Sequence, residues 1–219
     1  KGLFTQGMVC HETYKDQNNN WLSPEEISTN DGKKFYIKDK PNISVKVGPS
    51  ESMSKSKKNT IDPEKMIETY GADAVRLFIL SDSPPEKDIQ WSDSGMSSSY
   101  KFVQKFWQMS EQVFNVLKKE ETDASNEINL FTNQSISKIN FSLDKFRYNV
   151  IIAVFHEIYS FYKKILEQNK NYKNLKDNFE KILTIMIPVM PHMAFECLGQ
   201  LNKSKQKHLI IKNENNTHK

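Results

Sequence analysis

The strongest constraint on the fold is the near absence of glycine from the second half of the chain. Of the seven glycines, only Gly199 follows residue 95. In this half, apolar side chains recur at spacings of three and four, which is the repeat of an amphipathic α-helix. The first such stripe consists of Phe102, Phe106, Met109, Val113, Val116 and Leu117. It predicts a helix of roughly six turns that buries one face.

More helices of the same kind are expected after this one. They cover residues 128–143, 152–165 and 175–188, and a short fifth helix begins at Pro191, since proline suits a first helical turn. The pattern predicts an α-helical bundle whose aromatic and isoleucine stripes form the core. His192, at the start of the fifth helix, is either a structural histidine or a catalyst. No cysteine, serine or carboxylate motif accompanies it, which favours the structural role.

The first part of the chain is more mixed. Residues 11–50 alternate polar turns with short apolar pieces, which predicts a small β-rich insert in which residues 35–37 pair with 43–47. Two helices should follow. Asp62 caps the first, and the second covers residues 71–80. Asp73 there is either a partner for the helix dipole or a partner for Arg76.

Between the expected strands and helices lies a serine- and lysine-rich stretch, Glu51-Ser52-Met53-Ser54-Lys55-Ser56-Lys57-Lys58-Asn59. Only Met53 is apolar, so we expect the segment to lie outside any core. Its ammonium groups, hydroxyls and free backbone N–H groups can all bind phosphate oxygens. The alternatives are a phosphate-handling loop and a solvated basic linker.

Composition and charge narrow the class of protein. The 219 residues carry a formal net charge of +4, and no apolar run approaches the roughly 20 residues that span a bilayer. Cys10 and Cys197 stand apart without metal-ligand spacing, so neither a metal site nor a disulfide is expected. These features predict a cytoplasmic protein without a membrane partner. Because the chain opens at Lys1 with neither an initiator methionine nor a signal segment, we expect a piece of a longer protein.

The serine-rich loop resembles a known signature. Met53-Ser54-Lys55-Ser56, followed by Lys-Lys-Asn-Thr-Ile-Asp-Pro, resembles the KMSKS loop of class I aminoacyl-tRNA synthetases, with Ser52 in place of the first lysine. The resemblance implies that the loop closes over ATP, bound with Mg²⁺, and steadies the triphosphate while an aminoacyl-adenylate forms. It makes Lys55 the expected catalytic lysine. The implied ATP-binding residues are Ser52, Met53, Ser54, Lys55, Ser56, Lys57 and Lys58.

Other segments resemble the leucyl-tRNA synthetases in particular. These are L-x-T-Q-G-M-V at residues 3–9 and the Ser-Pro-Pro-Glu-Lys-Asp segment within residues 83–95. F-R-Y-N at 146–149 and P-x-x-P-H-M-A-x-E at 188–196 resemble the anticodon-binding bundle shared by the leucyl, isoleucyl, valyl and methionyl enzymes.

The resemblance implies a mostly α fold with three regions. Residues 1–95 would end a Rossmann-like nucleotide-binding domain, with the β-rich insert, the loop and a stem-contact region. Residues 96–202 would form the anticodon-binding bundle, and residues 203–219 a disordered tail.

The implied function is that of a leucine–tRNA ligase, a monomer that activates leucine with ATP and transfers it to tRNA(Leu). The second class I signature, H-I-G-H, is absent from this chain, so the chain alone is not expected to form an adenylate. The alternatives are the equivalent piece of a valyl-, isoleucyl- or methionyl-tRNA synthetase and a non-catalytic helical RNA-binding module.

Overall fold

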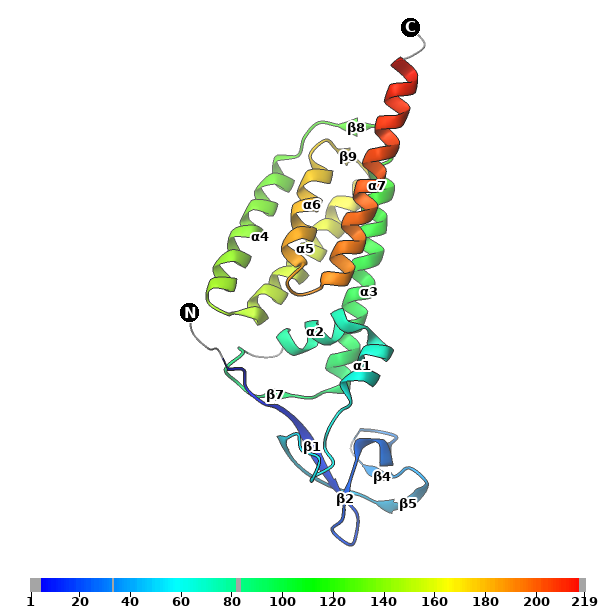
Figure 1. Cartoon of the computed structure of the whole chain (residues 1–219), viewed down its shortest axis with the longest axis vertical. Coiled ribbons are helices and arrows are strands. Elements are labelled where there is room, and N and C mark those ends of the chain that lie inside the picture. The colour runs from blue at the N-terminus through cyan, green and yellow to red at the C-terminus, as the bar shows by residue number, and fades with distance from the viewer. Residues whose placement is uncertain (1–4, 33, 82–83, 217–219) are drawn as a thin grey trace.

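The computed structural model describes residues 5–32, 34–81 and 84–216, with side chains described as far as residue 203. A β-rich part lies at one end and a bundle of long helices at the other (Figure 1). This confirms the mostly helical fold expected from the sequence. The first residues of the 3–9 segment, Ser83 and residues 217–219 lie outside the described residues.

Two small sheets form the β-rich part. In the first, β1 (Val9–Lys15) pairs antiparallel with β2 (Trp21–Leu22) and β6 (Lys46–Ser52), and parallel with β7 (Ile89–Gln90). In the second, β4 (Phe35–Ile37) lies between β3 (Ile27–Thr29) and β5 (Lys40–Ser44). The strand expected over 43–47 is therefore divided, because Tyr36 pairs with Ser44 whereas Val47 pairs with Tyr14 in the other sheet.

Two short helices connect the sheets to the bundle. They are α1 (Pro63–Tyr70) and α2 (Ala72–Ser81). Gly71 separates them with a φ of 81°, a backbone conformation that glycine adopts without steric cost. A single 3₁₀ turn at Pro24–Glu26 is the short helical element of the insert.

The bundle consists of α3 (Asp93–Val116), α4 (Asn126–Asp144), α5 (Tyr148–Glu167), α6 (Leu175–Met186) and α7 (Pro191–Asn216). Two-residue strands β8 (Glu121–Thr122) and β9 (Asn171–Tyr172) join the α3–α4 and α5–α6 connections. The core contains residues of the stripes predicted from the sequence, among them Phe106, Phe155 and Ile158, each 0% exposed. Burying such side chains stabilises the fold by about 1.5–3 kcal/mol each.

The last helix differs most from the expectation. We expected a short fifth helix and a disordered tail over 203–219, but α7 has 26 residues and continues to Asn216. Buried residues of its first turns, such as Ala194 and Cys197, anchor it in the bundle. Beyond Gly199 no glycine or proline interrupts the sequence, and a helix that is already formed extends through Lys, Gln, Leu and Glu at little cost.

Two further features concern the borders of the fold. The division expected after residue 95 falls inside α3, so one continuous helix joins the two parts. Among the described residues, no helix is both long enough and apolar enough to cross a membrane.

Candidate phosphate-binding loop and its junction with the bundle

The signature loop, residues 52–58, connects a strand to a helix. Strand β6 ends at Ser52, and the Met53 N–H donates to the Val9 carbonyl at 3.2 Å. A turn follows, in which the Lys58 N–H donates to the Lys55 carbonyl at 3.3 Å. The chain then enters α1, where the Asp62 carboxylate accepts from the Glu64 N–H at 3.0 Å. The N-cap predicted from the sequence is confirmed, and it places the lysines just before a helix start.

Asn59 fixes the loop to the sheet and is the main residue that sequence reasoning missed. It is 0% exposed, so the expectation that the whole stretch lies outside the core is wrong at this residue. Its Oδ1 accepts from the Ser54 N–H at 2.9 Å, and its Nδ2 donates to the carbonyls of His11 and Glu51, both at 3.2 Å. An asparagine in a polar stretch gives no sequence signal for such contacts.

The three lysines of the loop differ in their surroundings. Lys57 forms an ion pair with Glu51, and Lys58 lies 3.7 Å from Glu26. The Lys55 side chain is exposed and forms no ion pair with any described residue. Lys55, the expected catalytic lysine, therefore carries the loop's uncompensated positive charge.

The serines of the loop contribute hydroxyl groups on the same turn. Ser54 Oγ accepts from the Lys57 N–H at 3.3 Å and lies 3.3 Å from Ser56 Oγ. Ser52 and Ser56 are exposed. The loop thus offers a free ammonium group and hydroxyls, which are groups that bind phosphate oxygens.

His11 lies on β1 opposite Glu51. Its side chain is 8% exposed, and Nδ1 has no hydrogen-bond partner among the described residues. Burial lowers the pKa of His11, whereas the carboxylates of Asp93 and Glu12 act in the opposite direction. Burial thus favours the neutral form of the His11 imidazole.

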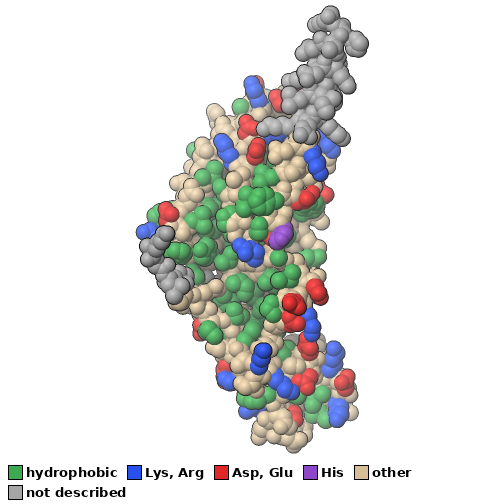
Figure 2. Space-filling model, viewed as in Figure 1, with side chains coloured by type: hydrophobic (Ala, Val, Ile, Leu, Met, Phe, Trp, Pro, Cys, Tyr) green, Lys and Arg blue, Asp and Glu red, His purple; other side chains and the backbone are tan. Residues whose placement is uncertain are grey.

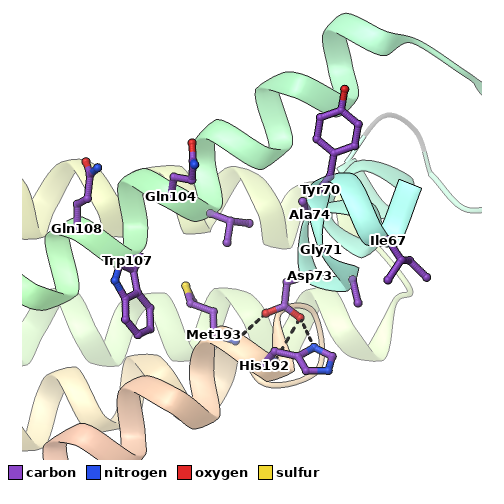
Figure 3. Close-up of a pocket in the computed structure, with 12 residues that line it drawn as sticks. Ile67, Tyr70, Gly71, Asp73, Ala74, Gln104, Trp107, Gln108, His192 and Met193 are labelled. Atoms are coloured by element: carbon purple, nitrogen blue, oxygen red, sulfur yellow. Dashed lines mark hydrogen bonds and ion pairs between the residues drawn. The ribbon is translucent and has the colours of Figure 1, made fainter. Parts of the chain in front are cut away.

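Two charged side chains of α2, Asp73 and Arg76, bind the turn between α6 and α7. Figure 3 shows the Asp73 contacts. Asp73 accepts from the backbone N–H groups of His192 and Met193 at 3.3 and 2.7 Å, and its Oδ1 lies 3.0 Å from His192 Nδ1. Arg76 instead donates to the carbonyls of Val189 and Pro188. The Asp73–Arg76 pair considered from the sequence is therefore wrong, and the structural reading of His192 fits this contact.

A cavity of about 670 Å³ lies beside this junction, between α1, α2, α3 and the start of α7. Its lining includes Ile67, Tyr70, Trp107 and His192, and no residue of the signature loop lines it. In Figure 3 the Asp73 carboxylate points toward His192 and Met193 at the start of α7. The cavity is mainly apolar and is separate from the lysines.

Charge and metal-ligand groups complete the description of the surface. On the face shown in Figure 2, Lys and Arg side chains are interspersed with Asp and Glu and do not form one continuous basic patch. Within the described ranges, no group of three or more His, Cys, Asp or Glu residues is placed to hold a metal ion. Cys10 and Cys197 are both buried and unpaired with each other.

Two family models match separate stretches of the chain. Residues 45–92 match the tRNA synthetases class I (I, L, M and V), and residues 125–217 match the anticodon-binding domain of tRNA ligase. The first match contains the signature loop, α1 and α2, and the second contains α4 to α7.

Curated relatives cover most of the chain. It is 39% identical over 215 residues to the leucine–tRNA ligase of Bartonella henselae, and 41% identical over 202 residues to that of Rickettsia bellii. The matches cover 93% and 92% of this chain and 24% of each relative. The chain thus spans about a quarter of the length of these relatives.

A solved structure shows the same fold. It is the ternary complex of Agrobacterium radiobacter K84 agnB2 LeuRS with tRNA and LeuAMS, with a TM-score of 0.61 at 20% identity over 69% of this chain and 20% of that chain. Sequence and fold agree with the resemblance found in the loop and the bundle. The chain belongs to the leucyl-tRNA synthetase family of class I aminoacyl-tRNA synthetases.

Proposed function

We propose that this chain is the part of a leucine–tRNA ligase that supplies the signature loop and the tRNA-binding bundle. The complete enzyme would activate leucine with Mg²⁺-bound ATP and transfer it to tRNA(Leu). The observation that carries the proposal is Lys55, an unpaired ammonium on a loop that Asn59 holds against the sheet. The leucine–tRNA ligases among the relatives favour leucine over valine, isoleucine or methionine as the substrate.

Lys55 would act on the triphosphate of ATP. In adenylate formation the leucine carboxylate attacks the α-phosphorus, the bond to the β-phosphate oxygen breaks, and pyrophosphate leaves. Negative charge grows on the departing oxygens, where a positioned ammonium group stabilises it. Hydroxyls of Ser52, Ser54 and Ser56 would add neutral hydrogen bonds, whereas the backbone N–H groups of Met53 and Ser54 are already bound within the protein, to Val9 and Asn59. Lys57 and Lys58 would contribute less, since Glu51 and Glu26 already offset their charges.

The bundle would bind tRNA through its polar surface. We propose the division expected from the sequence, with residues 1–95 as the catalytic part and 96–202 as the tRNA-binding part. The bundle's largest aromatic side chains, such as Phe106 and Phe155, are buried, so contacts to the RNA backbone and to its shape are favoured over base stacking. Binding should weaken as salt increases. Such an enzyme would work in the cytoplasm, and we propose that it is a monomer.

The test is pyrophosphate exchange by the full-length enzyme that contains this sequence. A charge-assisted hydrogen bond contributes about 1.5–3 kcal/mol, so Lys55→Ala should lower kcat roughly 10- to 150-fold. Lys57→Ala is the matched control and should cost less. Ser52→Lys should raise the rate modestly, because it adds a second ammonium group. Near-normal exchange by Lys55→Ala would mean that the loop is a solvated linker, and the non-catalytic RNA-binding alternative would then gain weight.

A further inference from the structure

The start of α7 is capped by a side chain that is distant in sequence. Pro191 opens the helix without an N–H group, so His192 and Met193 have its first free backbone donors. Such donors are usually satisfied by a serine, threonine or aspartate directly before the helix. Here both are bound by Asp73, which is 119 and 120 positions away and only 5% exposed.

The preceding turn is held by the opposite charge. Arg76, one helical turn after Asp73, donates from Nε to the Val189 carbonyl at 3.0 Å and from Nη2 to the Pro188 carbonyl at 2.6 Å. The carbonyl end of a helix favours a cation, and the N–H end favours an anion. Helix α2 therefore presents the favourable charge to each side of the α6–α7 turn, and we call these contacts the clasp.

The clasp lies a short way along the chain from the signature loop. The loop leads into α1, Gly71 turns the chain, and Asp73 is in the first turn of α2. On the same helix, Leu77 packs into the bundle core, whereas Ala74 and Phe78 pack with Met96 of α3. The loop itself is held independently, by the Asn59 contacts to His11 and Glu51.

We propose that Asp73 and Arg76 are positioning residues for the transfer of leucine to tRNA. This inference rests on the proposed function, in which the bundle carries the tRNA and the loop acts on ATP. Adenylate formation needs the loop, and among the described residues no hydrogen bond or ion pair joins the loop to the clasp. Transfer also needs the tRNA end to reach the adenylate, so it depends on the angle between the bundle and α2. A displacement of about 1 Å can cost roughly 100-fold in rate.

The experiment compares two rates in the full-length enzyme, pyrophosphate exchange without tRNA and aminoacylation with tRNA. Asp73→Asn keeps the size of the side chain but leaves one acceptor oxygen for three groups, which are the backbone N–H groups of His192 and Met193 and the His192 ring nitrogen Nδ1. It should lower the kcat of aminoacylation roughly 10- to 150-fold and change exchange by less than about 3-fold. Arg76→Lys keeps the charge but loses the fork of donors, so it should show the same split with a smaller loss.

Asn174→Ala is the matched control. Asn174 bonds to the backbone of Ser125 in both directions, at 2.9 and 2.8 Å, so its loss weakens a junction within the bundle and leaves the clasp intact. Thermal unfolding of each variant shows whether it is folded. If Asp73→Asn does not fold, the comparison of exchange with aminoacylation is made on Arg76→Lys.

The inference is supported if exchange and aminoacylation separate in the clasp variants and not in Asn174→Ala. It is overturned if the two rates fall together, which is the mark of a merely structural role, or if neither changes. A wild-type enzyme inactive in both assays would overturn the proposed function itself.

Discussion

Replacing Asn59 with alanine should release the signature loop without unfolding the protein. The change removes three hydrogen bonds, from Ser54 and to His11 and Glu51. At about 0.5–1.5 kcal/mol each, they contribute roughly 1.5–4.5 kcal/mol. Residues 52–58 bury no large apolar side chain in the cores of the sheet or the bundle. We therefore expect this free energy to be lost from local opening of the loop and not from global stability.

Hydrogen exchange at the Ser54 amide measures this opening directly, because Asn59 Oδ1 is the acceptor of that N–H group. Exchange in Asn59→Ala should be roughly 10- to 2,000-fold faster than in the wild type. In the full-length enzyme, the KM for ATP should rise, since fewer molecules hold the loop in place. Thr60→Ala is the control, because Thr60 is exposed and adjacent.

Asn59→Asp separates the two halves of the contact. An aspartate can accept from Ser54 but cannot donate to the carbonyls of His11 and Glu51, and it places a charge in a fully buried position. It should be at least as harmful as alanine. Unchanged exchange at Ser54 and an unchanged KM for ATP in both variants would show that β6 and α1 hold the loop without Asn59, and would refute this reasoning.

Two further predictions concern titration and thiol chemistry. Burial lowers the pKa of His11, so the unfolded chain takes up a proton near pH 6.5 that the folded chain resists. The free energy of unfolding should thus be fully retained above about pH 6.5 and should fall as pH drops toward the lowered pKa. His11→Gln should reduce the dependence of the free energy of unfolding on pH, measured by urea unfolding between about pH 5 and about pH 8. An equal dependence in the variant would contradict the lowered pKa of His11. Burial raises the pKa of Cys197 to about 11, so its thiol should react with a disulfide reagent at pH about 8 only after unfolding; fast reaction of the native protein would show that the Cys197 thiol is accessible.

The features that could be predicted from the sequence are those that depend on residues close together in the chain, namely the helices and the Asp62 cap. The stripes that include Phe106 and Phe155 identify helices because a helix brings residues three and four apart onto one face. The cap at Asp62 is also local, since it bonds to Glu64 only two residues away. Helix α7 was underestimated because its later residues form a helix without showing an apolar stripe.

The contacts of Asn59 and Asp73 could not be predicted from the sequence, because they join segments that are distant in the chain. Asn59 bonds to His11 across 48 positions, and Asp73 bonds to Met193 across 120. In the sequence these two residues look like a turn residue and a helix-start residue. Only the folded chain shows that each satisfies backbone groups of another segment. Lys55 was predicted by resemblance, and its role in catalysis stays a prediction.

Helix α3 determines more than a connection between the two parts of the molecule. Its Met96 packs with α2 at one end, and its Val113 lies in the bundle core near the other. Because each residue of an α-helix adds about 1.5 Å and 100°, one extra residue in the middle of α3 would swing the bundle by more than a quarter of a revolution about the helix axis. Seven extra residues would nearly restore the phase and move the bundle outward by about 10 Å. The number of residues in α3 thus sets both the rotation of the bundle about the helix axis and its distance from α2. Insertions and deletions should therefore be tolerated better in the loops around α3 than within it.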